Sequence, residues 1–151
     1  MKQRSISTQF GDLTLTEEGG AITALSWGAV AQQHASKLLD NAARQLAAYA
    51  AGTREGFDLP LRVTGSALQQ RVCAAMQAIP FGCTRTYGEL AKELGVPAQA
   101  VGQACGGNPI PILIPCHRVM GARGLTGFSG GAGVETKVAL LRHEGAAGLL
   151  I

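Results

Sequence analysis

An apolar segment interrupted by prolines and ending in a cysteine constrains this chain more than any other stretch. It runs from Asn108 to Val119, with prolines at 109, 111 and 115. These prolines exclude a continuous helix and favour extended backbone, so residues 112–114 are predicted to form a short buried strand leading to Cys116. A thiol next to His117 and Arg118 is in a setting that lowers thiol pKa and creates a nucleophile. The residues alone leave open the alternative of a buried structural cysteine.

Composition limits the classes of protein that fit. The chain has 151 residues, of which 46% are hydrophobic and 15% charged, which is typical of a folded protein with one good core or two small ones. We find no apolar stretch of membrane-spanning length and no apolar core of a signal peptide, so we expect a cytoplasmic protein without a membrane partner. Four irregularly spaced cysteines are then expected to be free thiols. Neither they nor the three histidines have ligand spacing, so we expect no metal and no cofactor. The net charge of +3 is only a weak indication of a polyanionic partner.

The pattern of the first half predicts an N-terminal α/β domain over residues 1–64. Clusters of β-formers at 5–10, 13–16 and 21–27 predict three strands, with turns at Gly11-Asp12 and Gly19-Gly20. An Ala- and Leu-rich stretch at 35–51 has apolar residues on one helical face. The Gly- and Pro-containing residues 53–65 are predicted to lead into the second domain, residues 65–151.

The second half predicts helices. A capping pattern opens a helix that ends before Pro80, and helices at 87–94 and 97–105 flank a turn at Gly95-Val96. Helix, glycine turn and helix form the outline of a helix-turn-helix, although an ordinary helical hairpin has the same spacing. A glycine-rich loop at 121–133 precedes a last helix at 134–143, in which Val134, Val138 and Leu141 are predicted to face inward.

Several motifs in order resemble one family. They are Gly107 to Val119; Ile79-Pro-Phe-Gly82 followed by Thr86 to Ala91; and Ser129-Gly-Gly131, Lys137 and Leu140 to Gly145. Together they are similar to the O6-alkylguanine-DNA alkyltransferases, which repair DNA directly. The resemblance implies an α+β fold, with a small ribonuclease H-like N-terminal domain followed by a helical, winged helix-turn-helix-like domain.

The activity that this resemblance implies is irreversible transfer of a methyl or small alkyl group. The group would pass from O6-alkylguanine in double-stranded DNA to the protein's own Cys116, after the nucleotide is flipped out of the duplex. O4-alkylthymine is a second candidate substrate. The resemblance implies no cofactor, and we expect a monomer.

The resemblance also assigns roles around the cysteine. His117 matches the base, which acts through a bound water, and Glu144 matches the carboxylate that orients the imidazole. Asn108 matches a hinge asparagine, and Tyr87 a tyrosine that helps to rotate the nucleotide and assists the leaving base. Without the match, Glu144 would be interpreted as a solvated residue at a helix end.

A further group of residues is expected near DNA or the extruded base: Ala98, Gln99, Gly102, Phe128, Ser129, Arg118 and Lys137. The helix at 97–105 is made of small residues, which suits close approach to a minor groove. The sequence departs from the family at three residues, since Gln99 replaces a frequent arginine, Phe128 a frequent tyrosine and Cys73 a frequent tryptophan. The turn before residues 97–105 also looks two residues shorter. For Arg118 a structural ion pair is the favoured interpretation, and for Lys137 a solvated face remains an alternative.

Other classes of protein compete with this interpretation. A non-catalytic lesion-binding relative would have tryptophan at the position of Cys116. A helix-turn-helix regulator would have a polar recognition helix, whereas residues 97–105 are small and uncharged. A Cys-His hydrolase would turn over repeatedly and would need an oxyanion site, for which the sequence offers no clear candidate.

Overall fold

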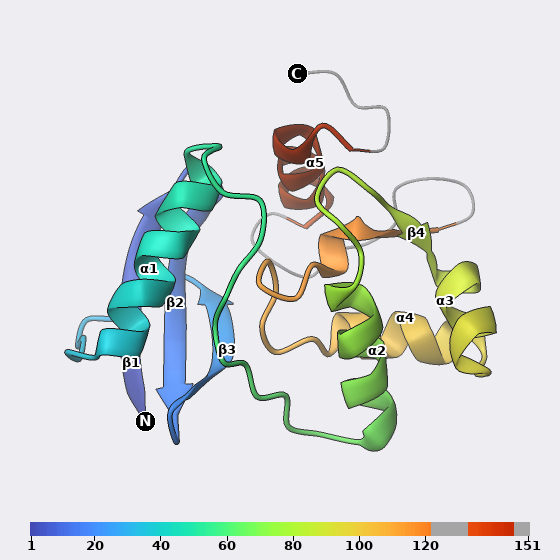
Figure 1. Ribbon diagram of the computed structural model, residues 1–151, viewed down its shortest axis with the longest axis horizontal. Helices are drawn as coiled ribbons and strands as arrows, with labels where there is room; N and C mark the ends of the chain where they lie inside the picture. Colours follow the sequence, from blue (N-terminus) through green and yellow to red (C-terminus); the bar gives the residue numbers. More distant parts are fainter. Residues whose placement is uncertain (122–132, 147–151) are drawn as a thin grey trace.

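Three antiparallel strands and one helix form the N-terminal part of the computed structural model, which describes residues 1–121 and 133–146 (Figure 1). The strands β1 (Lys2–Thr8), β2 (Gly11–Glu18) and β3 (Ala21–Trp27) lie in the order β1-β2-β3. The predicted turn at Gly19-Gly20 is confirmed, but the first turn falls at residues 9–10 because β2 already begins at Gly11. All three strands are therefore present, and the first two are longer than predicted.

Helix α1 (Lys37–Ala50) covers the sheet and contacts all three strands. Ser36 caps its first turn by accepting a hydrogen bond from the backbone N–H of Leu39 at 3.2 Å. The buried face of α1 includes Leu39, Ala42 and Leu46, which join Leu13 and Leu15 of the sheet in one hydrophobic core. The same core continues into the second half of the chain, so the two parts pack against each other.

The described residues of the C-terminal part contain four α-helices: α2 (Ala67–Gln77), α3 (Tyr87–Leu94), α4 (Ala98–Gly106) and α5 (Val134–Glu144). Thr86 and Glu89 form a capping box at the start of α3, and Gly95 ends this helix with a φ of 69°. The predicted turn between α3 and α4 is thus confirmed, and Pro97 is the N-cap of α4 rather than its first residue. Two short parallel strands, β4 (Arg85–Thr86) and β5 (Val119–Met120), join α3 to the segment that follows Cys116.

The predicted strand at 112–114 is wrong. The backbone N–H of Leu113 bonds to the carbonyl of Pro111 at 2.9 Å, and Ile112 between them has a φ of 71°, which is a γ-turn. The prolines do exclude a helix here, but they lead into a tight turn. Cys116 then begins a single turn of 3-10 helix, η1 (Cys116–Arg118).

The last helix begins at Val134 as predicted, but its inward face differs from the prediction. Val134 is 43% exposed, and Val138 is only partly buried. Leu141 is buried as predicted. The rest of the buried face carries Leu140 together with polar residues, Thr136, Lys137 and Glu144. Burial of charged residues on a surface helix indicates a polar site inside the protein. No helix among residues 1–121 and 133–146 has the length and apolar character needed to cross a bilayer.

Candidate active site

Cys116 lies at the start of η1 and is 8% exposed. Burial raises the pKa of its thiol, and a hydrogen bond from Asn108 and the charge of Lys137 offset only part of that rise. The thiol is therefore protonated at rest near neutral pH. Chemistry at this sulfur requires a group that accepts its proton.

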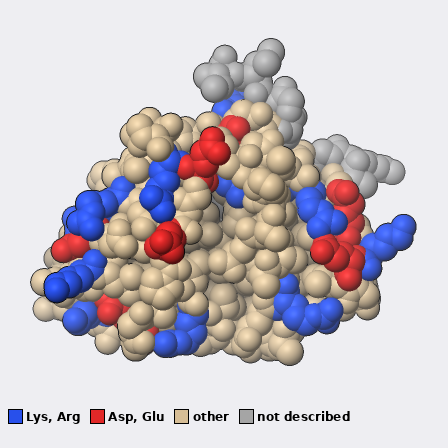
Figure 2. All heavy atoms as spheres, in the orientation of Figure 1, with Lys and Arg blue, Asp and Glu red and all other residues tan. Residues whose placement is uncertain are grey.

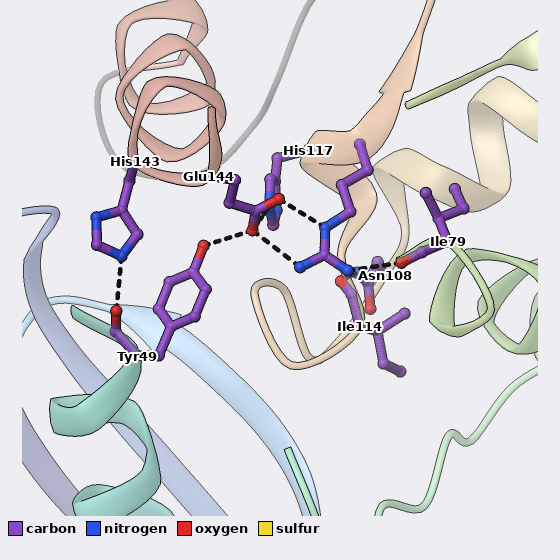
Figure 3. A network of polar contacts seen from close by, with 8 residues as sticks. Tyr49, Ile79, Asn108, Ile114, His117, His143 and Glu144 are labelled. Carbon is purple, nitrogen blue, oxygen red and sulfur yellow. Dashed lines mark hydrogen bonds and ion pairs between the residues drawn. The ribbon is translucent and has the colours of Figure 1, made fainter. Parts of the chain in front are cut away.

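His117, the next residue, is fully buried, and its Nε2 lies 2.8 Å from Oε2 of Glu144 at the end of α5 (Figure 3). A carboxylate in this position holds the imidazole with its proton on Nε2. The other nitrogen, Nδ1, is buried and has no hydrogen-bond partner within residues 1–121 and 133–146. Burial lowers the pKa of His117 more than Glu144 raises it, so the ring is neutral and Nδ1 carries a free lone pair.

Glu144 is buried, which excludes the interpretation of a solvated residue at a helix end. Arg118 donates to it through Nε at 2.7 Å and through Nη2 at 2.9 Å. Burial alone would raise the pKa of Glu144, but hydrogen bonds from His117, Arg118 and Tyr49 lower it to about 2. The carboxylate is thus fully charged, as an orienting group for an imidazole must be.

Arg118 does not lie on an open surface where it could contact DNA. It is 6% exposed and forms the ion pair with Glu144 that the sequence favoured for it. Its remaining nitrogen, Nη1, donates to the carbonyl of Ile79 at 2.6 Å. The expectation that Arg118 is a DNA or substrate contact is therefore wrong, because burial and the ion pair occupy its donors.

The side chain of Asn108 closes the turn before the cysteine. Its Nδ2 donates to the carbonyl of Ile114 at 2.9 Å, and its Oδ1 accepts from the N–H of Ile110 at 3.0 Å. Two hydrogen bonds from one side chain fix the turn that precedes Cys116.

Lys137 and Tyr87 approach the same region from α5 and α3. Lys137 is fully buried, which excludes a solvated face for it, and its Nζ donates to the carbonyl of Val119 at 2.6 Å. The same Nζ lies 6.0 Å from the centre of the Tyr87 ring. Burial lowers the pKa of Lys137, while the nearby thiols of Cys116 and Cys105 act in the opposite direction. A buried amine close to a thiol favours the thiolate form.

Sequence reasoning missed Tyr49. This tyrosine belongs to α1 in the N-terminal part, and its hydroxyl donates to Oε2 of Glu144 at 2.6 Å (Figure 3). The contact joins residues 95 positions apart. Helical periodicity places Tyr49 on the buried face of α1, but no local signal connects it with Glu144.

The expected DNA-facing residues of α4 are accessible. Ala98 and Gln99 are exposed, and Gly102 is partly exposed with no atom within 4 Å of where a Cβ would stand. Spacings of three and four residues put all three on one face of the helix. Figure 2 shows Lys and Arg in separate groups on the face in view, several of them beside Asp or Glu. Phe128 and Ser129, also expected near the base, lie outside the described residues.

The arrangement supports one kind of chemistry. A buried thiol is followed by a neutral histidine that can take a proton, and the histidine is held by a charged carboxylate. As in a catalytic triad, a carboxylate orients the base that deprotonates the nucleophile. Here the thiol and the base lie on a 3-10 turn, and the carboxylate lies at the end of α5.

Comparison with known proteins points the same way over both halves of the chain. A family model described as 6-O-methylguanine DNA methyltransferase, ribonuclease-like domain, matches residues 1–63, and one described as 6-O-methylguanine DNA methyltransferase, DNA binding domain, matches residues 67–146. These matches confirm the predicted α+β fold of a ribonuclease-like domain followed by a helical DNA-binding domain.

Relatives match along almost the whole length. The methylated-DNA–protein-cysteine methyltransferase of Mycobacterium tuberculosis is 42% identical over 151 residues, covering 93% of this chain and 90% of the relative. The constitutive enzyme of Bacillus subtilis is 39% identical over 151 residues, covering 91% of each chain. A crystal structure of the M. tuberculosis O6-methylguanine methyltransferase has a TM-score of 0.83 at 42% identity, covering 95% of this chain and 92% of that one. A second structure, M. tuberculosis OGT in complex with DNA, has a TM-score of 0.84 at 41% identity, with coverages of 96% and 93%.

Proposed function

Because the chain belongs to the O6-methylguanine DNA methyltransferase family, we propose that Cys116 is the residue that accepts the alkyl group. The chain is a methylated-DNA–protein-cysteine methyltransferase, which repairs O6-methylguanine in DNA directly. The other cysteines are poorer candidates. Cys73, Cys83 and Cys105 are each followed by a residue other than histidine, so none of them has an adjacent base as Cys116 does.

The observation that carries the proposal is the buried Nδ1 of His117, which has no hydrogen-bond partner in the part of the chain that the structure describes, while Glu144 holds the proton on Nε2. His117 accepts the thiol proton through a water molecule, and the resulting thiolate of Cys116 attacks the alkyl carbon. The sulfur–carbon bond forms as the carbon–O6 bond breaks, and the electron pair of the broken bond goes to the guanine. The base then takes up a proton, with the hydroxyl of Tyr87 assisting. The new thioether does not hydrolyse, so each molecule reacts once.

Two further side chains support the reactive sulfur. The buried Nζ of Lys137 favours the thiolate through its charge, and its hydrogen bond to the carbonyl of Val119 fixes its position. Asn108 holds the preceding turn, so that Cys116 is presented in one conformation. Both are positioning residues in this proposal.

The chain binds DNA, and its finer partner in our proposal is double-stranded DNA that contains O6-alkylguanine, with O4-alkylthymine as a second substrate. The lesion must leave the duplex to reach a buried thiol, which costs a few kcal/mol. The small exposed residues of α4, Ala98 and Gly102, allow close approach to a groove, and Gln99 takes the place of the flipped base. A thiol nucleophile needs a reducing environment and the substrate is DNA, so we place the protein in the cytoplasm. We propose that it acts as a monomer.

The test is methyl transfer from a duplex oligonucleotide that carries O6-methylguanine. Cys116→Ser is expected to abolish transfer, while Cys73→Ser and Cys83→Ser, as matched controls, retain it. A Cys-His hydrolase would instead release product repeatedly without keeping the methyl group. Transfer that survives in Cys116→Ser, or methyl that does not stay on the protein, would contradict the proposal.

A further inference from the structure

We propose that Tyr49 is a positioning residue of the alkyl-transfer site, through which the N-terminal domain fixes Glu144 in the orientation that receives His117. The inference rests on the proposed function, since it assigns a purpose to the His117–Glu144 pair. It gives the N-terminal domain a direct part in the chemistry, in addition to packing against the other domain.

The geometry places the Tyr49 hydroxyl within the buried network (Figure 3). Tyr49 is 1% exposed and donates to Oε2 of Glu144 at 2.6 Å. Its ring is held by neighbouring aromatic groups of both domains, with centroid distances of 5.4 Å to Phe57, 5.0 Å to His143 and 6.2 Å to Phe81. The ring is therefore confined, and its hydroxyl is aimed at one oxygen.

The hydrogen bond from Tyr49 is one of four that the Glu144 carboxylate accepts. Oε2 receives Tyr49, His117 at 2.8 Å and Nη2 of Arg118 at 2.9 Å, while Oε1 receives Nε of Arg118 at 2.7 Å. Three donors thus converge on Oε2 and one on Oε1, so the position of Oε2 is fixed by groups of both domains. Arg118 alone would fix the plane of the carboxylate, and Tyr49 adds a second donor to the oxygen that His117 uses.

The hydroxyl also limits how strongly Glu144 attracts the imidazole proton. Burial raises the pKa of Tyr49 far above its ordinary value, so the phenol remains a donor at every pH at which the protein works. Hydrogen bonds to Oε2 spread its negative charge. Without the Tyr49 hydroxyl, more of that charge acts on His117, and the pKa of His117 rises. Because only neutral His117 accepts the thiol proton, the acidic limb of the rate profile then moves to higher pH.

The experiment compares Tyr49→Phe with Gln45→Met in the full chain. Tyr49→Phe keeps the ring and removes the donor to Glu144. Gln45 is buried on the same helix, and Gln45→Met removes its hydrogen bonds with the backbone of Asp58, at 2.9 and 3.1 Å, which do not touch Tyr49 or Glu144. The probe is free O6-benzylguanine, which needs no nucleotide flipping. Its rate of reaction is followed from pH 5 to pH 9, beside thermal unfolding of each variant.

We expect Tyr49→Phe to move the acidic limb of the rate profile to higher pH by about 0.5 to 1 unit. At pH values on that limb the rate then falls about threefold to tenfold. Gln45→Met should lose thermal stability and keep the wild-type profile. A Tyr49→Phe profile that superimposes on the wild type, or that falls equally at every pH, would reduce Tyr49 to a packing residue. The variant His117→Gln distinguishes a failure of the Tyr49 proposal from a failure of the proposed function. If that variant also keeps the wild-type profile, the proposed role of His117 is wrong, whatever Tyr49 does.

Discussion

Glu144 is the single residue on which most of the buried charge depends. It is the ion-pair partner of Arg118, the acceptor for Tyr49 and the orienting group for His117. Its pKa in the folded protein is about 2, well below that of a glutamate in an unfolded chain. The unfolded state therefore binds more protons, and folding stability is lost as pH falls from about 4.5 toward 2.

We predict that Glu144→Gln lowers the free energy of unfolding by about 3 to 5 kcal/mol at pH 7, because it leaves the charge of Arg118 buried without a partner. The difference from the wild type should narrow as pH falls below about 4.5, since Glu144 of the unfolded wild type then takes up a proton while the folded carboxylate, with a pKa of about 2, stays charged. Chemical denaturation at pH 7, 5 and 3 measures this difference. The control is Glu55→Gln, at an exposed position. A difference that stays constant over this range would mean that Glu144 is not the titrating group.

Among the elements, the turn before Cys116 departs most from regular geometry. Ile112 has a φ of 71°, a conformation that β-branched residues rarely adopt, yet its side chain is 2% exposed. The hydrophobic side chain holds the residue in place while its backbone is strained.

Because of this strain, we predict that alanine loses its usual stability advantage over glycine at position 112. Both Ile112→Ala and Ile112→Gly lose about 2 to 5 kcal/mol of stability through the emptied core position. Glycine removes the strain of positive φ, worth about 1 to 2 kcal/mol, so Ile112→Gly should be at least as stable as Ile112→Ala. Ile110, which is fully buried and has no positive φ, is the control. There, alanine should be more stable than glycine, as is usual. Thermal unfolding that ranks both positions alike would contradict the strained turn.

Helix α4 gives a prediction in which stability and DNA binding change in opposite directions. Gly102→Ala should stabilise the free protein by about 1 kcal/mol, because alanine favours a helix interior and the added Cβ meets no atom within 4 Å. On DNA, the added methyl keeps α4 away from the groove, so affinity should fall several-fold. Gly56→Ala, a change in the segment between α1 and α2 with equally open space, is the control for binding. Fluorescence anisotropy on a labelled duplex measures the DNA affinity of both variants. If the affinity of Gly102→Ala is unchanged, Gly102 does not lie against DNA.

Across the whole molecule, local signals predicted the three N-terminal strands and the α-helices, but not β4, β5 or η1. The motifs predicted that His117 and Glu144 lie together, and the structure brings them into contact. The capping residue Thr86 and the glycine at 95 define α3 within single residues. The γ-turn at Ile112 escaped prediction because its φ is enforced by burial and by Asn108, which act from outside the residue itself. Tyr49 escaped because its contact with Glu144 depends on how the two domains pack, and no periodicity along one helix reports that.

In the proposed repair reaction one alkyl group moves to Cys116 and stays there. Intact-mass spectrometry after incubation with excess duplex containing O6-methylguanine, followed by peptide mapping, measures this transfer. We predict that the mass rises by one methyl group and then stops, with all of the added mass on the peptide that contains Cys116. Methyl on Cys105, more than one methyl per molecule, or substrate consumed without any gain in mass would rule out a single irreversible transfer to Cys116.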